Sequence, residues 1–218
     1  MLPPSIEAEI AELAARHGQP RRVDAELRGR PFHPLSQADR YGEVCMVLRR
    51  PSGKLLTAIK TFYPAGAFRL LTGGVGHGEP IGDALLREVA EETGLDVVVS
   101  RFLAVIEYHL AAVPGASWPT AAPAATPASI DIPQSYSFVT FAFLLDEVGG
   151  ELTVSDPDER IGAFREVAVG ELPALAETLE QSPDAADPEI DGSWRDWGRF
   201  RAIVHRVVYA ALSEPGAC

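Results

Sequence analysis

The stretch that decides the fold runs from Gly73 to Leu95 and reads GGVGHGEPIGDALLREVAEETGL. It begins as a glycine cluster and continues, over about residues 80–93, with the apolar spacing of an amphipathic helix. Proline is tolerated in the first turn of a helix, and Gly94 supplies a stop signal at its end. The stretch therefore predicts a glycine-rich loop that leads directly into a short helix.

Three glutamates share one side of this predicted helix. At about 100° per residue, Glu88, Glu91 and Glu92 fall within an arc of roughly 100°. Like charges at this spacing repel, so something must offset the cost. Hard divalent cations such as Mg²⁺ do so, because they bind carboxylates together with substrate phosphates. Arg87 is placed to pair with Glu91 or with Glu79 and so to orient a ligand.

The loop before the helix has the composition of a phosphate-binding loop. Residues without Cβ let the backbone turn tightly and bring N–H groups near phosphate oxygens, which makes Gly74 a candidate for substrate contact. Lys60 and Arg69 flank the segment that enters the loop and are candidates to hold phosphates. Ordinary surface placement is the alternative for both. His77 is either a substrate contact or an exposed loop histidine.

The spacing in this stretch resembles the complete Nudix box: Gly73, five residues, Glu79, seven residues, then REVAEETGL from Arg87 to Leu95. The resemblance implies an α/β fold, an α/β/α sandwich around a mixed β-sheet, with the box as a loop–helix–loop. It also implies a metal-dependent pyrophosphohydrolase. The substrate would be a nucleoside diphosphate linked to a group X, and the products a nucleoside monophosphate and phosphorylated X.

The same resemblance implies roles for individual box residues. Glu88 and Glu92 would be metal ligands, and Glu91 a ligand or the general base. Glu79 and Arg87 would organise the site.

Outside the helix, the resemblance implies that the backbone at Gly73 assists the binding of metal or phosphate, with Mg²⁺ or Mn²⁺ as the cofactor. In this family the base is a box glutamate or a glutamate from a later loop. The acidic segment 156–159 therefore makes Glu159 a candidate base, with a solvated acidic turn as the alternative. Thr72 stands where many members have proline, a departure that removes no ligand.

The chain around the box divides into three parts. Residues 1–40 are expected to form an N-terminal helix over 5–17 and a connecting arm over 19–40, with the core starting near Tyr41. Residues 41–180 are expected to form the hydrolase domain, and residues 181–218 an acidic linker and a C-terminal helix. The expected strands of the domain are 43–48 and 55–62 as a hairpin, 97–109, 137–145 and 160–169, followed by a helix over 171–180.

Two further segments carry aromatic residues. The Ala/Pro-rich stretch 111–133, with Trp118, is expected to be an insertion loop. In the last helix, which Ser193 can cap, Trp194 and Trp197 recur at helical spacing with Arg201. Such a stripe indicates core packing, and stacking on a nucleobase is the alternative.

Composition limits the possible partners. The formal net charge of −12 disfavours a nucleic acid polymer, and no apolar run approaches the roughly 20 residues that span a bilayer. Cys45 and Cys218 are the only cysteines, so neither a disulfide framework nor a zinc site is expected, and a cytoplasmic location is the default expectation. A nucleotide derivative is the expected ligand, and a homodimer is a possible assembly.

Two rival functions remain open at this stage. One is a Nudix-fold binding module that regulates a partner without catalysis; the retained box glutamates argue against it. The other is an isomerase-like relative that acts on a prenyl diphosphate, which no residue outside the box supports.

Overall fold

The computed structural model describes residues 2–27, 32–110, 136–154 and 156–214. Helices and strands follow one another along the chain as α1 (Pro4–His17), β1 (Arg21–Leu27), β2 (Arg40–Arg49), β3 (Leu55–Lys60), β4 (Arg69–Gly76), α2 (Ile81–Thr93), β5 (Leu95–Leu110), β6 (Tyr136–Gly150), η1 (Pro157–Glu159), β7 (Ile161–Val167), η2 (Val169–Glu171), α3 (Leu172–Glu180), β8 (Ala186–Asp187), β9 (Gly192–Ser193) and α4 (Trp194–Ser213).

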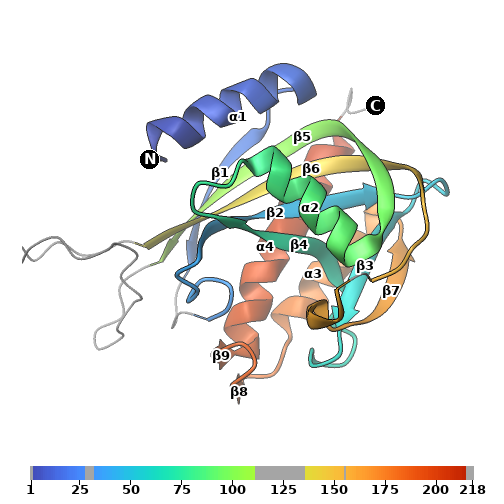
Figure 1. The fold of residues 1–218 in the computed structure, drawn as a ribbon. Coiled ribbons are helices and arrows are strands. Elements are labelled where there is room, and N and C mark those ends of the chain that lie inside the picture. The colour runs from blue at the N-terminus through green and yellow to red at the C-terminus, as the bar shows by residue number, and fades with distance from the viewer. Residues whose placement is uncertain (1, 28–31, 111–135, 155, 215–218) are drawn as a thin grey trace, which may run out of the picture.

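A seven-stranded mixed sheet forms the centre of the molecule, in the order β1-β5-β6-β2-β4-β3-β7. The pairs β1–β5 and β2–β6 are parallel, and the remaining neighbours are antiparallel. Helices α1 and α2 cover one face, and α3 and α4 cover the other (Figure 1). The predicted α/β/α sandwich around a mixed sheet is confirmed.

Each face of the sheet buries its own apolar core. On the first face, Leu85 of α2 packs in one cluster with Phe143 of β6. On the second, Val204 of α4 packs in another cluster with Leu175 of α3 and with alternate residues of the same strands. Because side chains alternate across a strand, long apolar strands such as β6 supply both cores at once.

The segment 19–40 departs from the expected connecting arm. Its residues Arg21–Leu27 form the edge strand β1, which lies parallel to β5 with Leu27 opposite Leu110. The alternation of Val23, Ala25 and Leu27 with charged residues is the period-2 signal of a half-buried strand. The sheet therefore begins before Tyr41.

The predicted hairpin of β2 and β3 is also only partly formed. The turn at residues 50–54 reverses the chain, but the two strands pair only at Arg49 and Leu55. Strand β4 lies between them over the rest of their length and pairs with both. This arrangement places the start of the glycine-rich stretch in the middle of the sheet.

The C-terminal helix α4 begins as predicted, because the Ser193 side chain accepts a hydrogen bond from the Arg195 backbone N–H. Its stripe is buried: Trp194 and Trp197 are 5 % and 1 % exposed. The packing interpretation of these two residues is confirmed. The expected linker before the helix contains strand β8, which pairs with β9.

Two predictions fall outside the described residues: the insertion loop over 111–133, with Trp118, and the environment of Cys218. Within the part of the chain that the structure describes, no helix has both the length and the apolar character needed to cross a bilayer.

Candidate active site

The loop between β4 and α2 is held by a single arginine. Arg87 Nε and Nη2 donate to the two carboxylate oxygens of Glu79, at 2.8 and 3.1 Å, and Nη2 also donates to the Gly74 carbonyl at 3.0 Å. The Glu79 carboxylate accepts from the Gly76 N–H at 3.0 Å. The guanidinium of Arg87 lowers the pKa of Glu79, which stays ionised. Glu79 and Arg87 thus fix the loop to the helix, and Gly94 ends the helix with φ 64°.

Beside this clamp, three carboxylates converge. Glu88 and Glu92 point from α2, and Glu159 comes from η1, far along the chain. One carboxylate oxygen of each lies within 4.8 Å of the others. Glu88 and Glu92 are only 6 % and 2 % exposed. Oxygen ligands at this spacing are what a hard divalent cation requires, so the cluster fits a divalent metal ion.

The carboxylates of this cluster differ in their pKa values. Burial raises the pKa of Glu92 to about 8, and burial also raises that of Glu88. Burial acts on Glu159 in the same direction, but the Lys60 ammonium 2.8 Å away and a hydrogen bond from Glu92 outweigh it and lower its pKa. Burial therefore disfavours the ionised forms of Glu88 and Glu92 when no cation is bound, and a bound metal ion would stabilise them.

Glu91 takes a different position from its two neighbours. Its side chain is 38 % exposed and accepts a hydrogen bond from Arg87 Nη1 at 3.0 Å. It lines the cavity next to the cluster but is not one of the three converging carboxylates among the described residues. The sequence grouped Glu91 with Glu88 and Glu92, whereas in the fold the third carboxylate beside Glu88 and Glu92 is that of Glu159.

Cationic side chains surround the same site. Lys60 pairs with Glu159, and Arg69 is only 4 % exposed, so the surface alternative for Arg69 is wrong. Arg69 donates to Tyr63 Oη at 3.1 Å and to Thr72 Oγ1 at 2.9 Å. Both Lys60 and Arg69 line a shared cavity.

Arg40 is a third lining cation, and the sequence analysis missed it. It precedes the core of β2 and has no motif around it. A Cβ on Gly74 would lie 2.4 Å from Arg40 Nη1, which shows how closely its guanidinium approaches the loop backbone. His77, in contrast, packs near the Tyr41 ring and does not line this cavity.

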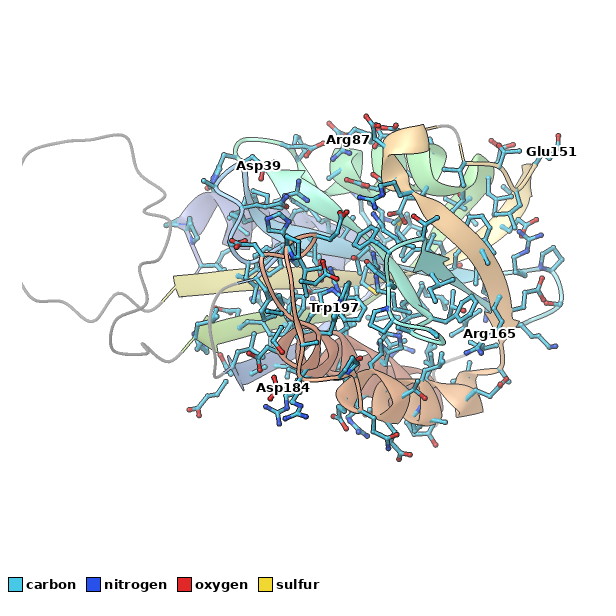
Figure 2. The ribbon with its side chains drawn as sticks, turned by 90° about the horizontal axis from the view of Figure 1, so that it is seen from below. Asp39, Arg87, Glu151, Arg165, Asp184 and Trp197 are labelled. Atoms are coloured by element: carbon cyan, nitrogen blue, oxygen red, sulfur yellow. The ribbon has the colours of Figure 1, made fainter. Side chains whose placement is uncertain are left out.

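The cavity has a volume of about 390 Å³ and runs from the box helix to α4. In Figure 2, Arg87 of α2 and Trp197 of α4 lie on opposite sides of the sheet. The box end is lined by Gly73, Gly74, Arg87, Glu88, Glu91 and Glu159, and the α4 end by Glu43, Phe62, Tyr63, Ile190, Trp197 and Arg201.

A buried ion pair lies at the α4 end of the cavity. Arg201 Nη1 donates to both carboxylate oxygens of Glu43 at 2.8 Å, and the two residues are 5 % and 2 % exposed. The sequence placed Arg201 in the buried stripe of the last helix but did not identify its partner. A charged residue within an apolar stripe was the available signal that a counter-charge lies opposite.

A glycine-rich loop, a helix with buried carboxylates and a cavity edged with cations together define a class of proteins: hydrolases that cleave phosphoanhydride bonds with the help of a divalent cation. The NUDIX domain family matches residues 39–189, so the chain belongs to the Nudix family. It is a Nudix-type pyrophosphohydrolase, whose acidic groups can hold a divalent metal.

Solved structures of Nudix enzymes resemble the chain at low identity. A MutT NUDIX hydrolase from Burkholderia pseudomallei is 25 % identical, with a TM-score of 0.40, over 66 % of this chain and 98 % of that one. A UDP-X diphosphatase is 17 % identical, with a TM-score of 0.42, over 82 % and 67 %. The E. coli dihydroneopterin triphosphate pyrophosphohydrolase is 16 % identical, with a TM-score of 0.37, over 64 % and 86 %. No curated protein matches the chain. Family membership follows from the family match alone.

Proposed function

We propose that this enzyme cleaves the phosphoanhydride bond of a nucleoside diphosphate linked to a group X and releases a nucleoside monophosphate and phosphorylated X. The convergence of Glu88, Glu92 and Glu159 within 4.8 Å, at one end of a cavity of about 390 Å³, supports this proposal most strongly. A cavity of this size falls in the range of small-molecule sites, roughly 300–1,000 Å³. It has room for a nucleotide.

In this proposal Glu88 and Glu92 hold the cation, Mg²⁺ or Mn²⁺. When bound, such a cation lowers the pKa of a water molecule and neutralises phosphate charge. Glu159 accepts the proton of the attacking water, because its lowered pKa keeps it ionised. Glu91 supports the site through Arg87, to which it is hydrogen-bonded.

The phosphates are held by the cations that line the cavity. Arg69 is buried, lines the cavity and donates to the neutral oxygens of Tyr63, Leu70 and Thr72, so its positive charge is available to a phosphate. Arg40 lies over the loop at Gly74, where backbone and guanidinium together bind an anion. Lys60 donates to Glu159 and, as a residue of the cavity wall, also contacts a substrate phosphate in this proposal.

A screen for phosphoanhydride cleavage tests the proposal. The purified chain is incubated with Mg²⁺ or Mn²⁺ and nucleoside triphosphates, ADP-ribose, nucleotide sugars, dinucleoside polyphosphates, NADH or coenzyme A, and the products are separated by chromatography. Metal-dependent formation of a nucleoside monophosphate and phosphorylated X is expected for one class. If no compound is cleaved but a nucleotide still raises the melting temperature, the protein is a binding module and the proposal fails.

A further inference from the structure

The buried Glu43–Arg201 pair has hydrogen-bonding capacity that the protein does not use. Glu43 Oε1 accepts from Arg201 Nη1 and from Thr140 Oγ1 at 3.0 Å, whereas Oε2 accepts only from Arg201 Nη1 among the described residues. Arg201 Nε is buried and has no partner in the described part of the chain. A carboxylate oxygen has room for a second donor, and a guanidinium has five N–H groups. The pair therefore has both an acceptor and donors to spare.

Burying a charged pair is costly, and apolar residues of the same size often replace such pairs without loss of stability. Here other side chains support the pair. Thr140 Oγ1 donates to the Glu43 carboxylate, and Thr140 also hydrogen-bonds to Tyr108 Oη at 3.4 Å. Both charged residues line the cavity. A supported polar pair in a cavity wall is typical of a group that fixes the orientation of a ligand.

The position of the pair relative to the phosphate loop limits what it can bind. Glu43 lies opposite Gly74 in the register of β2 and β4, one strand away from the glycine-rich stretch. The pair has no net charge, so it has little attraction for a phosphate, which the cations at the box end attract instead. Phe62 and Tyr63 flank this end of the cavity with partly buried aromatic rings. The environment suits a planar, uncharged group with hydrogen-bonding edges.

We propose that Glu43 and Arg201 recognise the hydrogen-bonding edge of the substrate's nucleobase: Glu43 accepts from a base N–H while Arg201 donates to the adjacent acceptor. This inference rests on the proposed function, because it places the phosphates of the same nucleotide at the box end. Every nucleobase has a donor beside an acceptor on such an edge, and their order differs between bases. The pair therefore determines base preference.

Binding of nucleoside monophosphates tests this proposal without any need for turnover. Titration calorimetry with Mg²⁺ gives the Kd of AMP, GMP, CMP and UMP, and that of ribose 5-phosphate, which lacks the base. In the wild type, at least one nucleotide is expected to bind about tenfold or more tightly than ribose 5-phosphate, as a charged hydrogen bond would provide. If none does, the chain has no base subsite and the proposal is overturned.

Two variants separate recognition from a structural role. Replacing both partners, Glu43→Leu with Arg201→Met, removes the charges together, so neither is left buried alone. The Kd of the preferred nucleotide is expected to rise until it is close to that of ribose 5-phosphate. The Kd of ribose 5-phosphate itself should stay unchanged. Equal weakening of all ligands, or an unchanged ratio, would contradict the proposal.

The second variant, Glu43→Gln, keeps the shape and exchanges one acceptor for a donor. It is expected to change the order of preference among the four nucleotides, and it also serves if the double variant does not fold. Glu180→Gln, in the exposed pair with Arg206, is the matched control and should leave the order unchanged. If hydrolysis fails while the nucleotide ratios hold, the proposed hydrolysis is wrong, and the pair recognises the base of a nucleotide that the protein binds without cleaving it.

Discussion

Gly73 and Glu88 are packed so closely that no side chain fits between them. A Cβ on Gly73 would lie 2.0 Å from Glu88 Cδ and 2.2 Å from its Oε2, inside the van der Waals distance of both atoms. The close approach means that the backbone at Gly73 forms one wall of the space that the Glu88 side chain occupies. The glycine is required by contact and not by its backbone angles.

Gly73→Ala should therefore displace Glu88 from the carboxylate cluster. A misplacement of about 1 Å at a reacting centre can cost about 100-fold in rate, and we expect at least that loss of kcat/KM. Steady-state assays at saturating Mg²⁺ measure it. Activity within a few-fold of the wild type would show that Glu88 does not need its present position.

Gly82→Ala in α2 is the matched control. The nearest atom to its Cβ, outside its own helix and neighbours, is Leu13 Cδ2 at 4.0 Å, so an alanine fits. Glycine in a helix interior is less favourable than alanine by about 1 kcal/mol, and Gly82 lies in the first turn of α2, so this variant should gain at most that much stability and stay fully active. Chemical unfolding and the same assay check both expectations.

Helix α1 caps the box helix from outside. Glu9 Oε1 accepts from the Ile81 backbone N–H at 2.5 Å. The N-cap residue of α2, Pro80, makes no capping hydrogen bond, because its side chain has no acceptor. Glu9→Ala should lower the free energy of unfolding by about 0.5–2 kcal/mol, the usual cost of a lost cap. Amide exchange at Ile81 should become faster. The exposed Glu12→Ala is the control, and unchanged exchange at Ile81 in Glu9→Ala would refute the cap.

Acid should destabilise the protein through His205. Burial lowers the pKa of His205 from 6.5 to about 4, and its Nε2 accepts from the Leu70 backbone N–H at 3.0 Å, which requires the neutral ring. Between these two values the unfolded chain binds the proton and the folded chain does not. The resulting stability, up to about 3 kcal/mol, is complete above pH 6.5 and is lost as the pH falls through about 4.

His205→Gln should flatten this pH dependence, because glutamine can still accept from Leu70 and does not titrate. Unfolding by urea at several pH values between 4 and 7 measures the slope in both proteins. His17→Gln at the end of α1 serves as the control. Parallel slopes for the wild type and His205→Gln would rule out this histidine as the source.

Local patterns predicted the elements that carry the box. The apolar spacing and Gly94 located α2, and the apolar runs of β5 and β6 located two buried strands of the sheet. Ser193 located the start of α4. These features succeed because capping, stop signals and periodicity act over a few residues.

Features that depend on distant residues were missed or only partly predicted. Strand β1 was taken for an arm because its partner β5 lies far along the chain and its period-2 alternation spans only Val23 to Leu27. Residues Glu43 and Arg201, 158 positions apart, meet only in the folded sheet. The acidic run made Glu159 a candidate, but only the packing of η1 shows that it lies beside Glu88 and Glu92.

The most direct test of the carboxylate centre compares the Mg²⁺-dependent hydrolysis rates of wild type, Glu92→Gln and the surface control Glu12→Gln, with the best substrate from the screen. Glu92→Gln removes one ligand charge without adding bulk, so the melting temperature should not fall, while the rate should drop at least about 100-fold. Glu12→Gln should match the wild type. Full Mg²⁺-dependent activity in a folded Glu92→Gln protein would contradict the assignment of this cluster as the hydrolytic centre.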